Sequence, residues 1–385
     1  MRKTVTIGDL GTIITGKTPP TTNKNYYGDY AVFIKPTDIS EQSKYTYETE
    51  EMYSKLAAEK YASSLVPKGA ICVPCIGTIG TKMTMTHCDC YTNQSINSIV
   101  CNENYDNEYV YYLIKNFLPG LKAYNLGTAS GREYVSKSNF EKIEIVVEQD
   151  KEIQKRIGRL LARYDTLIEN YQKQIKLLEE AAQRLYKEWF VELRFPGHEN
   201  TKMVDGLPEG WERKAVDSIY SIKYGKNLST KLISESGDFP VYGANGVIGY
   251  YDKANCNEQV VLITSRGNGS GDVLMTYHKE AFITNNSFIV SPLEDYSYCQ
   301  LPFTYQFLRN ANFRAVRTGA AQPQLTNQSI HTVDVVLPTK GLITAYCEKV
   351  SHSNEMIIRL KDQIRLLAEA RDRLLSRLMG GEREV

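Results

Sequence analysis

Residues Lys151 to Trp189 are the segment that most constrains how this chain can fold. Their apolar side chains recur in steps of three and four, and most positions between them carry Lys, Arg, Glu or Gln. This pattern predicts one long amphipathic helix with a narrow apolar stripe. A helix of about 39 residues would run roughly 58 Å, longer than one globular domain needs. Its stripe therefore requires a partner of similar length.

The chain contains such a partner between Leu342 and Leu378. There the pattern returns, and the sequence from Gln174 to Ala181 aligns with the sequence from Gln363 to Ala370. Two such helices can pack side by side as an antiparallel coiled coil. Periodicity alone leaves a second possibility open, a helical hairpin that serves only as a dimerisation arm. The predicted seam consists of Ile157, Leu160, Tyr164, Leu167, Tyr171, Leu178, Leu185, Ile357, Leu360, Ile364, Leu367 and Leu374.

The repeat extends into the segments that precede the two helices. Thr92-Asn93-Gln94-Ser95 aligns with Thr284-Asn285-Asn286-Ser287, and Ser98-Ile99-Val100 with Phe288-Ile289-Val290. Further matches follow in the same order in both halves, which indicates duplication of a unit of about 190 residues. They are a Gly-rich turn (76–80 and 266–271), a Gly-Thr/Ala-Ala segment (127–129 and 319–321) and a strand before each helix (143–147 and 333–337).

Each repeat combines short β-rich runs with a few helical segments. Strands are predicted at 31–34, 70–73, 260–263 and 282–290, and helices near 108–117 and 303–309. The predicted fold class is therefore α/β (α+β): two tandem-repeat domains separated by two long helices in an antiparallel coiled coil with pseudo-twofold symmetry. The predicted parts are domain 1 (1–149), a central helix (150–194), domain 2 (195–338), a C-terminal helix (339–380) and a tail (381–385).

The composition indicates a soluble protein without a strongly basic surface. The 385 residues include 46 Lys and Arg against 45 Asp and Glu. No apolar run approaches the roughly 18 residues of a membrane span, so a cytoplasmic location is expected. A cytoplasmic location also favours reduced cysteines. A zinc site at Cys72, Cys75, Cys88 and Cys90 with His87 is an alternative that the spacing leaves open, and buried thiols are favoured.

The segment from Gly11 to Thr18 matches the P-loop pattern of nucleotide-binding proteins. A P-loop places phosphate at the start of a helix, and here Pro19-Pro20 and a polar run follow Thr18. A basic loop is the favoured interpretation, and an NTPase is kept as an alternative function. No catalytic constellation of His, Cys, Ser or paired carboxylates is recognised. The chain is expected to bind rather than to catalyse.

Polar and basic residues in loops are the candidates for DNA contact. Arg and Lys can bond guanine, Asn and Gln can bond adenine, and all of them can bond phosphates. A solvated surface is the alternative for each of them. In the first half the candidates are Lys17, Thr18, Lys24, Lys35, Lys82, Arg132 and Lys137; in the second half they are Lys223, Lys226, Asn227, Arg266, Asn268, Arg314, Arg317, Gln322 and Gln324.

Several motifs in this order resemble the specificity (S) subunits of type I restriction-modification systems. They are Thr15-Gly16-Lys17-Thr18-Pro19, the Gly-rich turn 76–80, the helix end from Arg184-Leu185 to Trp189-Phe190, Arg194-Phe195-Pro196-Gly197, Leu207-Pro208-Glu209-Gly210-Trp211-Glu212 and Gly319-Ala320-Ala321-Gln322-Pro323. The resemblance covers nearly the whole chain. One departure is that Gly127–Gly131 lacks the Gln-Pro of the second repeat, so Ser130 is not assigned the role of Gln322.

The resemblance implies two target-recognition domains, each reading one half of a split sequence in double-stranded DNA. The two helices would act as a spacer and as the docking surface for two modification (methyltransferase) subunits. Restriction (endonuclease/translocase) subunits would join that complex. The chain itself would hold no cofactor and no metal, and S-adenosylmethionine, ATP and Mg would be bound by the partner subunits. A stand-alone DNA-binding protein of the same kind is the remaining alternative.

Overall fold

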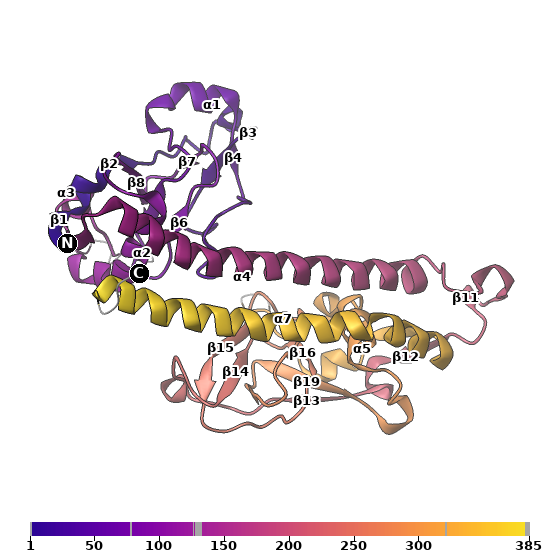
Figure 1. The fold of residues 1–385 in the computed structure, drawn as a ribbon. Helices are drawn as coiled ribbons and strands as arrows, with labels where there is room; N and C mark the ends of the chain where they lie inside the picture. Colours follow the sequence, from indigo (N-terminus) through magenta and orange to yellow (C-terminus); the bar gives the residue numbers. More distant parts are fainter. Residues whose placement is uncertain (1, 78, 126, 128–132, 320–321, 382–385) are drawn as a thin grey trace. The chain divides into compact units, whose positions relative to one another are not determined.

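The computed structural model describes all residues except 1, 78, 126, 128–132, 320–321 and 382–385. The chain divides into two compact units (Figure 1). The first unit comprises Met1–Tyr171 with Gln363–Val385, and the second comprises Gln172–Asp362. Each unit therefore contains one globular half and a part of each long helix.

The two long helices form where the sequence predicts them. Helix α4 spans Lys151–Tyr186 and continues into one π-helical turn at Lys187–Val191. Helix α7 spans Lys340–Gly380. It ends at the predicted boundary, residue 380, because Gly381 adopts a φ of +82°, a conformation that residues with a Cβ rarely adopt.

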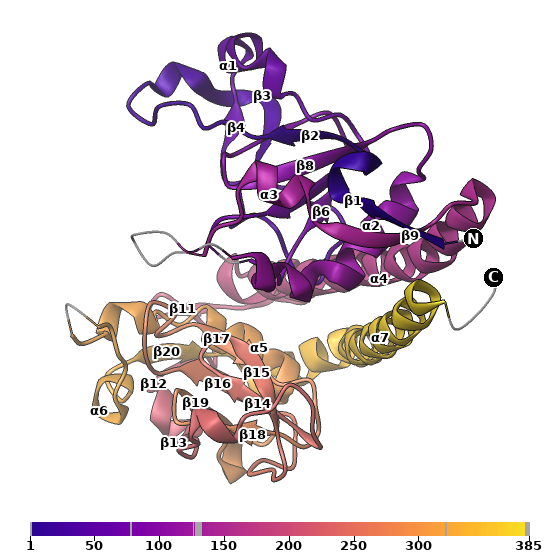
Figure 2. The same cartoon turned by 90° about the vertical axis from the view of Figure 1, so that its left-hand side faces the viewer.

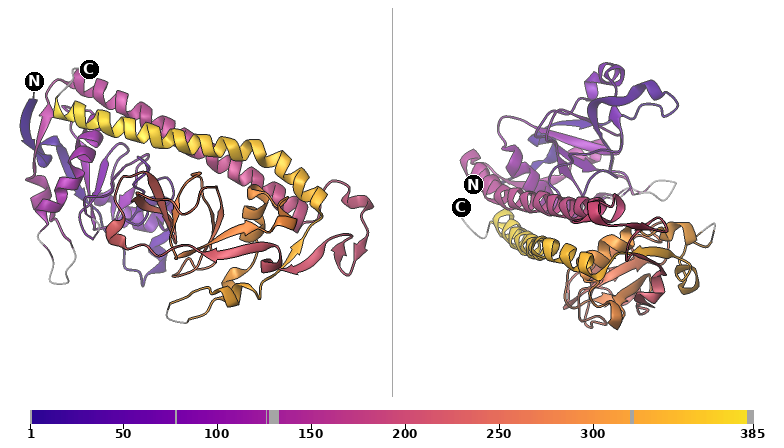
Figure 3. Two further views of the ribbon diagram at one scale, coloured as in Figure 1. Left: turned by 90° about the horizontal axis from the view of Figure 1, so that it is seen from below. Right: turned by 90° about the vertical axis from the view of Figure 1, so that its right-hand side faces the viewer.

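The two helices run antiparallel within the second unit. The Lys361 ammonium lies 3.6 Å from the Glu179 carboxylate, and the Tyr346 hydroxyl donates to the Ala182 carbonyl at 3.0 Å. As the position advances along α4, its partner on α7 moves back toward the start of that helix. In the first unit the end of α7 packs beside the start of α4 (Figure 3), and Arg371 forms an ion pair there with Asp165. The predicted antiparallel pairing is therefore present in each unit.

The predicted seam needs one correction. Ile157, Ile357 and Leu360 are buried, but Leu167 is 37% exposed. Leu161, Ile168 and Ile175 are buried instead, and they repeat at the seven-residue spacing of a coiled-coil position. The physical reason is that α4 is covered both by α7 and by its own globular domain, so its most buried face turns toward both neighbours. The remaining predicted seam residues are half-buried: Leu160, Tyr164, Tyr171, Leu178, Leu185, Ile364, Leu367 and Leu374.

The first unit contains two small sheets and a two-stranded ribbon. The sheet orders are β2-β8-β5-β6 and β4-β3-β7, and β1 pairs antiparallel with β9 just before α4 begins. Its helices are α1 (Lys55–Lys60), α2 (Asn107–Phe117) and α3 (Lys137–Glu141). The strands are β1 (Arg2–Thr6), β2 (Gly11–Thr15), β3 (Tyr27–Ile34), β4 (Met52–Tyr53), β5 (Ile71–Pro74), β6 (Thr84–Met85), β7 (Tyr91–Thr92), β8 (Ile96–Cys101) and β9 (Glu144–Glu148).

The second unit repeats this topology (Figure 2), so the duplication predicted from the sequence is confirmed. Its sheet orders are β13-β19-β16-β17 and β15-β14-β18, and β12 pairs antiparallel with β20 just before α7. Its helices are α5 (Leu301–Arg309) and α6 (Asn327–Ile330). The strands are β10 (Met203–Val204), β11 (Leu207–Pro208), β12 (Glu212–Ala215), β13 (Tyr220–Tyr224), β14 (Phe239–Gly243), β15 (Gly246–Tyr251), β16 (Val261–Thr264), β17 (Val273–Met275), β18 (Phe282–Ile283), β19 (Ser287–Pro292) and β20 (Asp334–Leu337).

Two of the sequence alignments between the repeats are one residue out of register. The Lys17 amide donates to the Thr92 carbonyl, whereas the equivalent Lys226 amide donates to that of Ile283 rather than Thr284. On the next strand, Ile99 pairs with Ile71 just as Val290 pairs with Val261. The predicted strand 282–290 is also divided, because residues 284–286 form the turn between β18 and β19. Backbone pairing defines which residues of the two repeats are equivalent more strictly than the similarity of residue types in a turn does.

The buried contacts around the helices differ between the units. In the first, the Arg371 guanidinium binds Asp165, and the Tyr112 hydroxyl donates to the same carboxylate at 2.5 Å. When Gln174 is aligned with Gln363, Ala182 is the equivalent of Arg371 and Asn354 is the equivalent of Asp165 in the other repeat. Gln306 corresponds to Tyr112, since each lies six residues after the N-cap of its helix.

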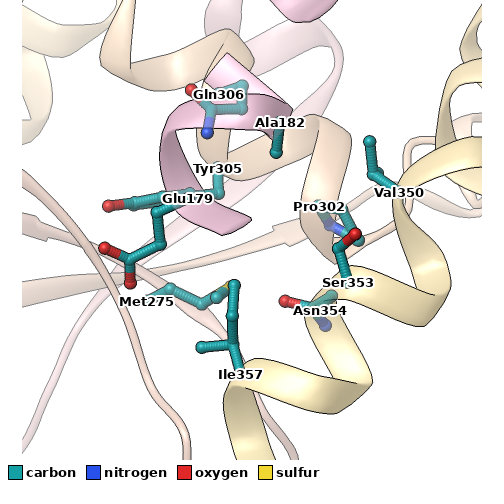
Figure 4. A pocket seen from close by; sticks show the side chains of 10 residues that line it. All are labelled: Glu179, Ala182, Met275, Pro302, Tyr305, Gln306, Val350, Ser353, Asn354 and Ile357. Atoms are coloured by element: carbon teal, nitrogen blue, oxygen red, sulfur yellow. The ribbon is translucent and has the colours of Figure 1, made fainter. Parts of the chain in front are cut away.

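Where the first unit has this ion pair, the second has a small cavity (Figure 4). Its volume is about 30 Å³, and its lining includes Ala182, Gln306 and Asn354. The Oε1 atom of Gln306 is buried and has no hydrogen-bond partner among the described residues. The two units therefore share a fold but fill this position differently.

Candidate nucleic-acid interface

In the second unit, several loops meet at one end of the four-stranded sheet. The Gly225 amide donates to the Ser287 carbonyl at 3.0 Å, which joins the end of β13 to the start of β19. The Ser265 amide donates to the Asn286 carbonyl at 2.8 Å and attaches the end of β16 to the same turn. The backbone of three strands therefore fixes this end of the sheet.

A distant loop joins the same end of the sheet. Arg266 and Gln324 form a β-bridge, and the Leu325 amide donates to the Ser265 carbonyl at 2.8 Å. The Tyr224 hydroxyl lies 3.4 Å from the Leu325 carbonyl, which it contacts as a donor. This arrangement brings together candidates from three parts of the sequence: Lys226 and Asn227, Arg266 and Asn268, and Gln322 and Gln324.

The first unit has the same arrangement. The Gly16 amide donates to the Ile96 carbonyl at 3.2 Å, and the Cys75 amide donates to that of Ser95 at 2.7 Å. Ile76 and Tyr134 form the β-bridge that corresponds to the bridge between Arg266 and Gln324. Because both copies are built by the same backbone bonds, each residue at one sheet end has a defined counterpart at the other.

Gly16 and Gly225 allow this close approach. A Cβ at Gly16 would lie 2.2 Å from the carbonyl oxygens of Thr92 and Asn93, and one at Gly225 would lie 2.3 Å from that of Thr284. Such distances are far below van der Waals contact, so only glycine fits without a backbone shift. The Gly-Lys pair that occurs in both repeats is therefore explained by packing against a turn, with the lysine held next to it.

The lysine after each glycine has a fixed backbone and an exposed side chain. The Lys17 amide donates to the Thr92 carbonyl at 2.9 Å, and its own carbonyl accepts from the Tyr53 hydroxyl at 2.6 Å. The Lys226 amide donates to the Ile283 carbonyl at 3.0 Å, and its carbonyl accepts from the Asn285 amide at 3.0 Å. Within the described residues, neither ammonium lies within 4.0 Å of a carboxylate, although Lys17 reaches the Ser63 hydroxyl at 3.5 Å. Both cations are available to an anion.

This site does not have the geometry of a P-loop. The segment that matches the motif consists of strand β2 followed by Gly16–Pro20, which have no helical structure. The helix start that would bind a nucleotide phosphate is therefore absent at Lys17, and the NTPase alternative is not supported. Thr18 instead contacts the Gln94 side chain through its hydroxyl.

Several other predicted contact residues are bound to carboxylates. Lys35 contacts Glu50 at 2.6 Å and Glu51 at 3.2 Å; burial opposes its charge, but these bonds outweigh burial and raise the pKa of Lys35. Arg314 binds Asp272 at 2.5 Å, and Lys137 lies 3.6 Å from Glu141. Their positive charge is partly neutralised within the protein, so they are weaker candidates for DNA contact.

The remaining predicted residues vary in exposure. Lys82 is half-buried, and Arg132 lies outside the described residues, as does Ser130. Arg317 is half-buried, and its Nε and Nη2 atoms are buried without a hydrogen-bond partner among the described residues. A guanidinium in this state would gain from an anion. The exposed candidates are Lys17, Thr18, Lys24, Lys137, Lys223, Lys226, Asn227, Arg266, Asn268, Arg314, Gln322 and Gln324.

The alternative metal ligands lie mainly in the core of the first unit. Cys72, Cys75 and Cys90 are buried, and the Cys72 sulfur lies 3.3 Å from the Ser98 hydroxyl. Cys88 is half-buried and lies 3.3 Å from the His87 ring. Across the described part of the chain, no group of three or more His, Cys, Asp or Glu side chains is arranged to hold a metal ion.

Sequence reasoning missed some residues at these sheet ends. Tyr53 was not singled out, yet its hydroxyl holds the Lys17 carbonyl; its ring is stacked on Tyr91 at 4.6 Å. Asn245, in the hairpin turn between β14 and β15, lies beside Gly269 of the Gly-rich turn. The Asn245-Gly246 pair is a recognised turn signal, but nothing local in the sequence indicates which loop it faces.

The family model for the type I restriction modification DNA specificity domain matches the sequence of this chain twice, at residues 2–180 and 208–364. The chain belongs to this family. The two matches correspond to the two repeats, so the chain is a specificity subunit with two tandem target-recognition domains. No helix among the described residues is long and apolar enough to cross a membrane.

Individual relatives agree with this assignment. The MjaIX specificity subunit of Methanocaldococcus jannaschii is 26% identical over 411 residues, covering 98% of this chain and 93% of the relative. The HindI specificity subunit of Haemophilus influenzae is 38% identical over 143 residues, covering 36% of this chain and 30% of the relative. The crystal structure of a type I S subunit from M. genitalium covers 98% of this chain and 96% of that chain, with a TM-score of 0.58 and 19% identity, and so has a similar fold.

Proposed function

We propose that each globular domain reads one half of a bipartite sequence in double-stranded DNA. The observation that carries this proposal is the repeated sheet end, where Lys17 and Lys226 have fixed backbones and exposed ammonium groups that no carboxylate of the described residues approaches within 4.0 Å. A phosphate backbone is recognised by such cations, and the polar side chains beside them match the donors and acceptors of base edges. Two copies of the site in one chain suit a target with two specified halves.

The paired helices are proposed to set the distance between the two halves of the target. Helix α4 contributes residues 151–171 to the first unit and 172–186 to the second, and α7 likewise contributes to both. A continuous helix has a rise of about 1.5 Å per residue, so its length translates directly into spacing. Its exposed polar face is proposed to dock two methyltransferase subunits, which restriction subunits then join.

The chain is proposed to have no catalytic activity of its own. The site is built from cations and amides on loops, which suits binding rather than acid, base or nucleophilic chemistry. S-adenosylmethionine, ATP and Mg are accordingly assigned to the partner subunits. Because the chain has a net charge of only +1, the isolated subunit is expected to bind DNA weakly.

Methylation mapping tests this function directly. The chain is coexpressed with a methyltransferase subunit of the same system, and methylated adenines are mapped in the host genome. The expected result is a motif of two short specified sequences separated by a fixed gap. A continuous motif would contradict the two-domain reading. Sequence-specific, tight binding by the subunit alone would instead favour a stand-alone DNA-binding protein.

The spacer role has its own test. Four residues are inserted into α4 and four into α7, which should lengthen the helices by about 6 Å, equivalent to roughly two base pairs. The unspecified gap in the methylated motif should grow accordingly, while both specified halves stay the same. An unchanged gap with an active complex would exclude the spacer role.

A further inference from the structure

The two sheet ends can be compared position by position, because the same backbone hydrogen bonds build both. One position carries the same residue in both units, Lys17 and Lys226. Another carries different residues: Ile76 pairs with Tyr134 in the first unit, and Arg266 pairs with Gln324 in the second. Two domains that read different half-sites are expected to share only those DNA contacts that do not depend on the DNA sequence. The comparison therefore provides a criterion for assigning candidate residues to the DNA backbone or to the bases.

We propose, building on the function proposed above, that Lys17 and Lys226 bind equivalent DNA phosphates. We further propose that the bridged pair beside each lysine reads base identity. The lysines thus set the register of each domain on the duplex, and the pairs supply its specificity.

The backbone geometry around the lysines supports the first part. Both the amide and the carbonyl of each lysine are hydrogen-bonded, so the Cα position is fixed relative to the sheet. The preceding glycine cannot be replaced without a clash against a carbonyl oxygen. A flexible ammonium group on a fixed backbone is suited to binding a phosphate, because a phosphate needs a positive charge but no bidentate geometry.

The chemistry of the bridged pairs supports the second part. In the second unit Arg266 and Gln324 are both exposed, and neither side chain takes part in an ion pair or hydrogen bond within the described residues. Arg suits the two acceptors of guanine and Gln suits adenine in the major groove. Ile76 and Tyr134 in the first unit are half-buried and largely apolar. Such side chains suit contact with the methyl group of thymine.

The bridge itself explains why the pair acts together. Antiparallel pairing places the two Cα atoms opposite each other, and side chains at opposed positions lie on the same face. The Gly267 and Leu325 amides flank the bridge with bonds of 3.0 Å to the Pro323 carbonyl and 2.8 Å to the Ser265 carbonyl. One β-bridge would therefore hold two base-contacting side chains next to each other on a rigid backbone.

The phosphate role is tested with a fluorescein-labelled 40-base-pair duplex of mixed sequence and the full chain. Binding is measured by anisotropy across a salt series. Lys17→Ala and Lys226→Ala should each reduce the slope of log affinity against log salt by about 0.9, and the double variant by about 1.8. Lys17→Arg should restore the slope. Lys349→Ala, which removes an exposed lysine from α7, is the charge-matched control and should change the slope less. Unchanged slopes in both lysine variants would overturn this role.

The reading role is tested by selection from a random-sequence duplex library with the subunit in complex with its methyltransferase. Gln324→Ala should relax one or two base pairs in one half-site and leave the other half-site intact. The lysine variants should lower the yield without changing the selected sequence. The double graft Ile76→Arg with Tyr134→Gln should replace a base preference in the other half-site.

The outcomes separate this inference from the function on which it rests. If the unaltered complex selects no bipartite sequence, both the function and the inference fail. If it selects one and Gln324→Ala leaves both half-sites unchanged, only the assignment of the reading pair fails. A changed half-site sequence in Lys17→Ala or Lys226→Ala would likewise overturn the division between phosphate and base contacts.

Discussion

Arg371 and Asp165 form a buried ion pair that joins the end of α7 to the start of α4 within the first unit. The side chains are only 9% and 6% exposed. Burial opposes the charge on Arg371, but the hydrogen bonds that its guanidinium donates to Asp372 and Asp165 outweigh burial and raise the pKa of Arg371. The Tyr112 hydroxyl on α2 donates to the same carboxylate at 2.5 Å. Three helices of the first unit are thus held by one cluster.

Removing one member of this pair should strongly destabilise the first unit. Arg371→Ala leaves the Asp165 carboxylate buried without its cation, and such a loss costs about 3–5 kcal/mol. The measurement is the free energy of unfolding in urea, compared with Asp372→Asn at the more exposed partner. The triple change Arg371→Met, Asp165→Leu and Tyr112→Phe, which removes all three polar partners together, should recover much of the loss. A loss below about 1 kcal/mol for Arg371→Ala would show that the pair is not buried in solution.

The cavity in the second unit predicts a substitution that stabilises the protein, in contrast to the destabilising change at Arg371. Gln306→Met keeps the side-chain length and removes the Oε1 atom, which has no hydrogen-bond partner among the described residues and lies in the cavity lined by Ala182 and Asn354. A buried acceptor without a partner costs about 1–3 kcal/mol, so the variant should be more stable by up to that amount. Urea unfolding measures the change, with Gln322→Met as an exposed control. A cavity of about 30 Å³ has room for a water molecule. A decrease in stability would show that the amide is hydrogen-bonded in solution.

Alanine at the glycines before the lysines should weaken DNA binding and stability together. Gly225→Ala places a Cβ at 2.3 Å from the Thr284 carbonyl oxygen, so the loop carrying Lys226 must move. We expect a loss of roughly 1–3 kcal/mol in unfolding free energy, by analogy with overpacked sites, and a lower affinity for duplex DNA. Gly341→Ala on α7 is the matched control, since its Cβ would meet nothing within 4 Å. Normal DNA binding by Gly225→Ala would exclude a fixed lysine position.

The buried cysteines predict how stability changes at alkaline pH. Burial raises the pKa of Cys72 and of Cys75 from an ordinary value of 9.0 to about 12. Between these values the unfolded chain loses the thiol proton and the folded chain keeps it, so the folded state binds more protons. Stability should therefore fall as the pH rises from about 9 toward 12. Replacing both cysteines with alanine should reduce this fall, measured as urea unfolding at pH 8 and pH 10. An equal fall in the variant would contradict burial of the thiols.

The long helices and the duplication were accessible from the sequence because both depend on local pattern. Apolar residues in steps of three and four specify a helix wherever they occur, and α4 and α7 begin at or within two residues of the predicted starts. Gly16 and Gly225 also mark places where one backbone approaches another closely, but only the backbone hydrogen bonds of the structure identify them as equivalent. The sequence could thus confine the candidate contact residues to loops, and their role in binding DNA stays a prediction.

The availability of each cation was decided by residues distant in sequence. Lys35 is engaged by Glu50 and Glu51 from another loop, and Arg314 by Asp272. A sequence pattern does not show which carboxylate folds back onto which lysine. For the same reason it could not separate these cations from Lys17 and Lys226, which remain unpaired with carboxylates within the described residues.

The sequence by itself determined the element types, their order and the existence of two equivalent halves, because helix period, strand punctuation and repeats are properties of local residue patterns. The tertiary structure alone decided the exact register between the halves, the buried face of α4 and the pairing of Arg266 with Gln324. These depend on which surfaces meet and on which backbone groups bond. Helix α4, which constrained the fold most strongly, illustrates both contributions. Its length follows from its residue pattern, whereas its set of buried residues follows from packing against both α7 and a globular domain.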